Sequence, residues 1–156
     1  MIKQFHGRDG RISLDVIAST LTPFHAGLSE GQLRAIQDYL YSLLEWNRSM
    51  NLTAIDDPME ILSRHFGESL FAASLLKIGE SRLADVGTGP GFPGLPLRIV
   101  CPEMKLSLFE SNSRKCAFLT EIVQRLQFSG VNIRKQRYEE FRSDDARFDF
   151  VCSRAL

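Results

Sequence analysis

The chain has 156 residues, enough for one domain around a single hydrophobic core. Hydrophobic residues make up 44% and charged residues 24%, with 19 basic and 19 acidic side chains, which excludes a strongly basic nucleic-acid-binding chain. The three cysteines, Cys101, Cys116 and Cys152, are too far apart for a disulfide framework or a zinc site of paired cysteines, and no apolar run reaches the roughly 18 residues of a membrane span. We therefore expect a cytoplasmic protein without metal or membrane attachment.

Helical periodicity dominates the first half of the chain. It predicts a short helix within 12–24 and a longer one that begins after the N-cap Ser29 and runs to about Arg48. Pro58 suits the first position of a further helix. The inward face of that helix is predicted to be Leu62, Phe66, Ser69, Ala73 and Leu76.

The turn at Gly79 separates this part from a second pattern. We divide the chain there into an N-terminal helical region, 1–79, and a second region, 80–156. The second region alternates strands and helices, with strands predicted at 83–86, 104–109, 131–135 and 148–152, helices at 95–100 and from a capping Ser113 to about 126, and a helical turn at 138–142. This order predicts an α/β fold with a parallel sheet and crossover connections.

A glycine-rich stretch, Asp85–Gly94, follows the first of these strands and holds four glycines in eight residues. The G-x-G-x-x-G spacing at 89–94 is also that of the dinucleotide-binding fingerprint. A pyrophosphate binds through backbone N–H groups, but Pro90 and Pro93 have none, and Asp85 would put a carboxylate at the mouth of the loop. A sulfonium cation with a free amino group suits this loop better, so we predict S-adenosylmethionine over NAD. A glycine-rich turn without a ligand is the remaining alternative.

Ligands of parallel sheets bind at the carboxyl ends of the strands. Glu110, at the end of the second strand, could accept hydrogen bonds from both ribose hydroxyls of an adenosine. Tyr138 and Glu139 could flank an adenine, and Arg154 could meet the methionine carboxylate or an RNA phosphate. The alternative for each of these side chains is an exposed residue without a ligand.

Three features that the sequence lacks limit the class of reaction that this chain could catalyse. The fourth strand ends in Cys152-Ser153-Arg154 and not in the Asp/Asn-Pro-Pro-aromatic motif of exocyclic-amine methyltransferases. Cys152 has no evident neighbour to lower its pKa, and no His/Asp pair is placed as a general base. Guanine N7 needs none of these, because its lone pair is free at neutral pH. Catalysis would then be in-line positioning, with no obligatory acid or base.

Five ordered motifs lie between about Ser29 and the last residue: Trp46-Asn47-x-x-x-Asn51-Leu52-Thr53, Arg64-His65 followed by an acid and Ser69, Asp85–Gly94, Tyr138-Glu139-Glu140-Phe141, and Phe148-Asp149-x-Val151-x-Ser153-Arg154-Ala155. Together they resemble the ribosomal small-subunit methyltransferase G family, also called the glucose-inhibited division protein B family. The resemblance implies a Rossmann-like class I methyltransferase that uses S-adenosylmethionine to methylate N7 of a guanine in 16S ribosomal RNA.

Site residues follow from the motifs and the resemblance together. The expected cofactor contacts are Asp85, Gly87, Gly89, Gly91, Phe92, Glu110, Tyr138, Glu139 and Arg154. The expected contacts with RNA of the small ribosomal subunit are Arg48, Arg64, His65, Arg114 and Lys115. Each basic residue has the alternative of a solvated charge, and His65 that of a core histidine with satisfied hydrogen bonds.

The sequence departs from the family in two places. Glu68 stands where the family usually has aspartate, and the similarity among family members continues beyond the equivalent of Leu156. We therefore expect a sheet that is incomplete at the C-terminus, with an open edge. We separately expect the protein to be a monomer. A non-catalytic cofactor- or RNA-binding remnant of the family is the alternative function, and an NAD-dependent oxidoreductase is the third.

Overall fold

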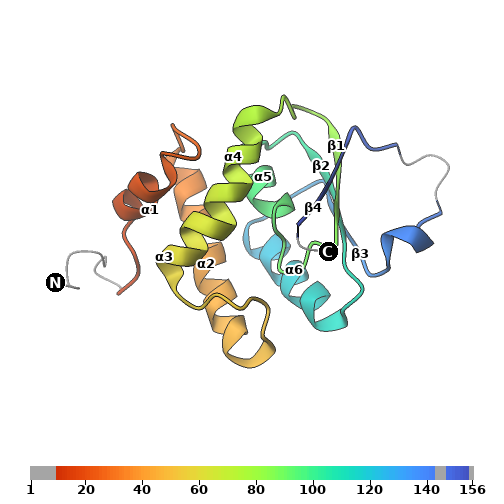
Figure 1. Cartoon of the computed structure of the whole chain (residues 1–156), viewed down its shortest axis with the longest axis horizontal. Coiled ribbons are helices and arrows are strands. Elements are labelled where there is room, and N and C mark those ends of the chain that lie inside the picture. The colour runs from red at the N-terminus through yellow and green to blue at the C-terminus, as the bar shows by residue number, and fades with distance from the viewer. Residues whose placement is uncertain (1–9, 143–146, 155–156) are drawn as a thin grey trace.

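The computed structural model describes residues 10–142 and 147–154, as helices followed by a sheet with further helices (Figure 1). The helical elements are α1 (Leu14–Leu21), α2 (Glu30–Met50), α3 (Pro58–Glu60), the π-helical segment η1 (Ile61–Gly67), α4 (Glu68–Leu75), α5 (Gly94–Val100), α6 (Ser113–Arg125) and the 3-10 turn η2 (Tyr138–Glu140). The strands are β1 (Arg82–Val86), β2 (Lys105–Phe109), β3 (Val131–Arg134) and β4 (Phe150–Ser153).

Helix α2 begins where the sequence predicts. Ser29 is its N-cap, and a capping box joins the two residues that close the first turn: Gln32 N donates to Ser29 Oγ, and Ser29 N donates to Gln32 Oε1. The helix continues to Met50 and ends at Asn51, whose φ of 48° lies in the left-handed region. The predicted helix is thus confirmed and extends slightly further.

The helix predicted from Pro58 is not one α-helix. Asp57 caps it and Pro58 occupies its first turn, but the backbone becomes π-helical over Ile61–Gly67 before α4 resumes the α form. Leu76 has left the helix with an extended backbone and is 42% exposed, so its predicted inward position is wrong.

Helix α6 corrects a second expectation. The Asn112 side chain accepts hydrogen bonds from the backbone N–H groups of Arg114 and Lys115, at 2.9 and 3.2 Å. Asn112 is therefore the N-cap and Ser113 the first helical residue. The prediction of Ser113 as the cap is wrong by one position.

All four strands pair in parallel in the order β3-β2-β1-β4, which confirms the predicted sheet. Because β1 lies between β2 and β4, the switch point of the sheet lies at the carboxyl ends of β1 and β4. Helices α5 and α6 cover one face of the sheet with α2 behind them, and among the described residues only the segment with η2 lies on the other side (Figure 1).

One hydrophobic core joins the helical part to the sheet. Tyr39 and Phe66 pack against Phe92 with ring centroids 5.2 and 5.1 Å apart, and Trp46 packs against Phe118 at 5.6 Å. The division into regions 1–79 and 80–156 stays a prediction, since buried residues of both parts form the same cluster. No helix in the described ranges is long and apolar enough to cross a membrane.

Candidate functional site

The loop after β1 bonds its backbone donors to other groups of the protein. The bonds are Gly87 N and Thr88 N to Phe109 O (3.0 and 3.2 Å), Gly89 N to Glu110 Oε2 (3.1 Å), Gly91 N and Phe92 N to Thr88 O (2.9 and 3.1 Å), and Gly94 N to Asp85 Oδ2 (2.8 Å). Pro90 and Pro93 have no N–H. Every backbone N–H between 87 and 94 is therefore used internally, and none remains free to bind a phosphate.

Asp85 lies beneath this loop and not at its mouth. Its side chain is fully buried, and Oδ2 accepts hydrogen bonds from Thr88 Oγ1 at 2.7 Å and from Gly94 N at 2.8 Å. Burial raises the pKa of the carboxyl group to about 6, although these two hydrogen bonds and the Arg154 charge oppose the shift. The expected position at the mouth of the loop is wrong, and Asp85 holds the loop from inside through Thr88 and Gly94.

A cavity of about 240 Å³ opens at the carboxyl ends of β1, β2 and β3. It is lined by Val86, Gly87, Phe109, Glu110, Ser111, Gln136, Arg137, Tyr138 and Glu139. Four of these are predicted cofactor contacts: Gly87, Glu110, Tyr138 and Glu139. The others lie within two positions of those residues at the same strand ends, and that position was the signal that could have found them.

Glu110 places a carboxylate in this cavity, and two backbone N–H groups hold it in position. Only 8% of the residue is exposed, and its two oxygens accept from Gly89 N at 3.1 Å and from Asn112 N at 2.8 Å. Each carboxylate oxygen has further acceptor capacity, which two vicinal hydroxyls could use. Tyr138 stands beside it with its ring edge-on to Phe109, 5.0 Å between centroids.

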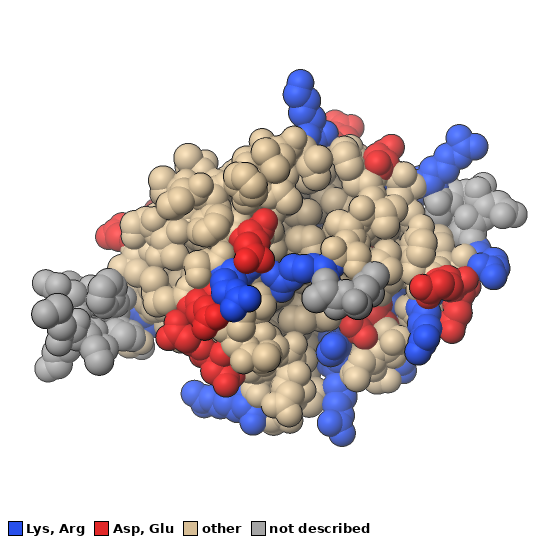
Figure 2. All heavy atoms as spheres, in the orientation of Figure 1, with Lys and Arg blue, Asp and Glu red and all other residues tan. Residues whose placement is uncertain are grey.

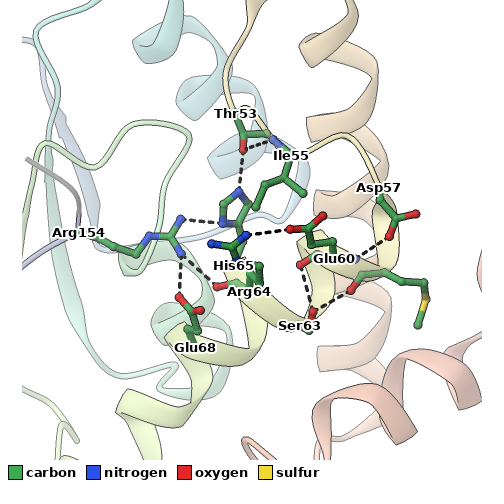
Figure 3. A network of polar contacts seen from close by, with 10 residues as sticks. Thr53, Ile55, Asp57, Glu60, Ser63, Arg64, His65, Glu68 and Arg154 are labelled. Atoms are coloured by element: carbon green, nitrogen blue, oxygen red, sulfur yellow. Dashed lines mark hydrogen bonds and ion pairs between the residues drawn. The ribbon is translucent and has the colours of Figure 1, made fainter.

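Arg154 follows β4 and reaches across to η1 and α4 (Figure 3). Its guanidinium donates to His65 Nδ1 at 2.8 Å and to the Arg64 carbonyl at 3.2 Å, and it lies 3.8 Å from a Glu68 carboxylate oxygen. It also covers the Phe92 ring, 5.4 Å from the centroid. Arg154 is thus at the switch point, outside the wall of the cavity.

His65 is a core histidine. It is 9% exposed, and its Nε2 lies 2.7 Å from Thr53 Oγ1 while Nδ1 faces Arg154 (Figure 3). Burial, with the charges of Arg154 and Arg64, lowers the pKa of the imidazole to about 4. The neutral ring accepts from Arg154 and donates from Nε2 to Thr53. The prediction of His65 as a surface RNA contact is therefore wrong, and the core alternative holds.

Phe92, predicted as a cofactor contact, points down into the core. It is 2% exposed and packs against Tyr39, Phe66 and His65. Gly91 above it has φ +102°, and a Cβ there would come within 2.5 Å of the Leu95 side chain. These contacts hold the Gly91–Phe92 part of the loop against the hydrophobic core.

The remaining predicted RNA contacts are distributed over the surface. Arg48 lines a polar hollow of about 580 Å³ at the end of α2. Arg64 is exposed and pairs with Glu60 at 2.8 Å, and Arg114 and Lys115 lie in the first turn of α6. Figure 2 shows acidic and basic side chains interspersed on the visible face, with no broad area of positive charge.

A family model described as rRNA small subunit methyltransferase G matches residues 32–156. The chain belongs to this family. A ribosomal RNA small subunit methyltransferase G of Xylella fastidiosa is 44% identical over 119 residues, which are 76% of this chain and 54% of that protein. The protein of the same description from Pseudomonas aeruginosa is 38% identical over 142 residues, 91% of this chain and 65% of the relative. The chain thus spans between about half and two thirds of the length of these relatives.

Solved structures show the same fold at low identity. A protein-L-isoaspartate O-methyltransferase aligns with a TM-score of 0.59 at 10% identity, over 90% of this chain and 47% of the other. Coclaurine N-methyltransferase bound to N-methylheliamine and SAH aligns with a TM-score of 0.53 at 14% identity, over 90% and 50%. The parallel sheet and its connections are those of the class I methyltransferase fold.

Proposed function

We propose that this chain is the S-adenosylmethionine-binding part of an enzyme that methylates N7 of a guanine in 16S ribosomal RNA. Family membership supports the substrate class. The observation that carries the cofactor assignment is the loop whose backbone donors are all engaged, beside a cavity that offers the Glu110 carboxylate. A dinucleotide pyrophosphate would find no free N–H there and a like charge nearby.

The cavity fits the adenosine end of the cofactor. Glu110 would accept from the ribose hydroxyls, and the Tyr138 ring with Glu139 would flank the adenine. The methionine end would extend over Gly87 towards the switch point between β1 and β4, where Arg154 carries a positive charge. When bound, S-adenosylmethionine supplies an electrophilic methyl group.

The side chains near the switch point favour an acceptor that needs no general base. Both nitrogens of His65 are engaged, and its lowered pKa makes it a weak base. Burial, together with the Asp85 charge, raises the pKa of the Cys152 thiol well above its usual range, so it stays protonated. Guanine N7 has a free lone pair, and the protein would act by orienting it.

RNA would approach the basic side chains that remain after His65 is removed from the set, of which Lys115 is partly buried and the other three are exposed. They are Arg48, Arg64, Arg114 and Lys115. Phosphate contacts by these residues would make binding weaken as salt rises. The protein would act in the cytoplasm on the small ribosomal subunit, as a monomer.

Calorimetric titration of the purified chain with S-adenosylmethionine and with NADH tests the cofactor. We expect binding of S-adenosylmethionine alone, weakened about tenfold or more in Glu110→Gln, because the substitution removes the negative charge that strengthens its bonds to the ribose hydroxyls. Glu121→Gln, on α6, is the matched control. Binding of NADH alone, or of neither compound, would refute the cofactor assignment.

Transfer of labelled methyl groups to small subunits lacking the modification tests the reaction. Label in 16S RNA at guanine N7 is the expected result. Cofactor binding without transfer would mean that this chain is a binding module. We name this alternative because the chain covers only 54% of the Xylella fastidiosa relative.

A further inference from the structure

We propose that Tyr39 of helix α2 is the positioning residue of the glycine loop, and therefore a determinant of cofactor affinity. The inference rests on the proposed function. The Tyr39 hydroxyl donates a hydrogen bond to the Pro90 carbonyl, and its ring stacks on Phe92 with centroids 5.2 Å apart and planes at 6°. One side chain thus contacts both Pro90 and Phe92 of the loop, and Pro90 is 51 positions away from it in the sequence.

Tyr39 is built into the protein as a donor. The residue is completely buried in the core between the helices and the loop. Burial first, and then the charge of Asp85, raises the pKa of the phenol well above its ordinary value. The O–H group therefore remains protonated at every pH at which the protein would be assayed.

The loop lies directly on this side chain. A Cβ at Gly91 would collide with the Tyr39 hydroxyl, so the absence of a side chain at position 91 is what permits the contact. Within the loop, Gly91 N and Phe92 N both donate to the Thr88 carbonyl, which closes a tight turn. The Pro90 carbonyl belongs to the same turn, and it accepts the hydrogen bond that the Tyr39 hydroxyl donates.

Loop position bears on the cofactor because the same segment forms the cavity wall. Gly87 lines the cavity, and Gly89 N donates to Glu110, the proposed ribose acceptor. If the Pro90 carbonyl were released, the loop would gain conformations in which these groups are displaced. The apparent dissociation constant rises as the fraction of the competent conformation falls, even when the fold is intact.

The chain offers a matched pair of variants for the test. Tyr39→Phe removes the hydroxyl and keeps the stacked ring. Tyr41→Phe removes a hydroxyl from the same helix, one that accepts a hydrogen bond from Ile12 N at 2.8 Å and not from the glycine loop. Each variant is titrated with S-adenosylmethionine under conditions where urea unfolding shows it fully folded.

We expect Tyr39→Phe to bind S-adenosylmethionine about fivefold or more weakly, and Tyr41→Phe to bind like the parent chain while losing comparable stability. Equal affinity of all three proteins, or equal weakening in both variants, would overturn the inference. Failure of the parent chain itself to bind would instead refute the proposed function.

Should Tyr39→Phe fail to fold, the loop side of the contact provides the test. Gly91→Ala places a methyl group against the Tyr39 hydroxyl and the Leu95 side chain, and Gly130→Ala is the comparison for a positive-φ glycine outside the loop, since it has φ +69° and no atom within 4 Å of the added Cβ. Weaker binding in Gly91→Ala alone would support the inference, and unchanged binding in both would overturn it.

Discussion

Replacing Asp85 by asparagine should change how the free energy of unfolding depends on pH. The carboxyl group has a pKa of about 6 in the folded protein against an ordinary 3.8, so the folded state favours the protonated form. The stabilisation of the folded state that results is fully present below about pH 4 and is lost as the pH rises through 6. A difference of about two pKa units corresponds to about 3 kcal/mol.

His65 has the opposite effect over almost the same range. Its pKa falls from 6.5 to about 4 on folding, so its contribution is fully present above pH 6.5 and is lost as the pH falls through 4. The magnitude is again about 3 kcal/mol. Between pH 4 and 6.5 the effects of the two groups on the free energy of unfolding therefore nearly cancel in the parent protein. A variant that lacks one group should show the pH dependence caused by the other.

Urea unfolding at a series of pH values between about 4 and 7 measures this. We expect the stability of Asp85→Asn to rise by about 3 kcal/mol over that range, relative to the parent profile. The stability of His65→Asn, which keeps an acceptor towards Arg154 but cannot titrate, should fall by a similar amount. A pH profile of Asp85→Asn parallel to that of the parent protein would show that the buried carboxyl group does not have a raised pKa.

Two further pairs of substitutions test local packing and capping. Gly94→Ala should lower the free energy of unfolding in urea by about 1–3 kcal/mol, because the added Cβ would lie 2.7 Å from Asp85 Oδ2. Gly31→Ala, in the first turn of α2, is the control and should be neutral or stabilising. Equal stability of the two variants would contradict the packing described. Asn112→Ala should cost about 1 kcal/mol as the N-cap of α6, and Ser113→Ala should cost little; the reverse order would restore Ser113 as the cap.

The elements that the sequence predicts well are those whose signals are local. Ser29 with Gln32 is a capping box within four residues, and the alternation of strands and helices after Gly79 determines the parallel sheet by connectivity rules. Glu110 and Tyr138 were predicted as cofactor contacts because strand ends in such a sheet converge, and both line the cavity. These signals need no knowledge of which side chains pack together.

The errors come from contacts between distant residues. The sequence placed Asp85 at the mouth of the loop because its donors, Thr88 and Gly94, cover it only once the loop has folded. His65 resembles a surface charge until Thr53 and Arg154 occupy its nitrogens. The Tyr39 hydroxyl meets the loop across 51 positions, and helical periodicity carries no information about such a pair.

The π-helical turn at Ile61–Gly67 sets a constraint on length. A π-turn holds an extra residue, and each residue of an α-helix advances the direction of its side chain by about 100°. Removing one residue within Ile61–Gly67 would restore a continuous α-helix and keep its two halves in register. If Phe66 or Gly67 were the residue removed, His65 and Glu68 would stand two positions apart, on different faces of the helix, and could no longer both meet Arg154. We therefore expect insertions and deletions to be tolerated less in this segment than substitutions at its exposed positions.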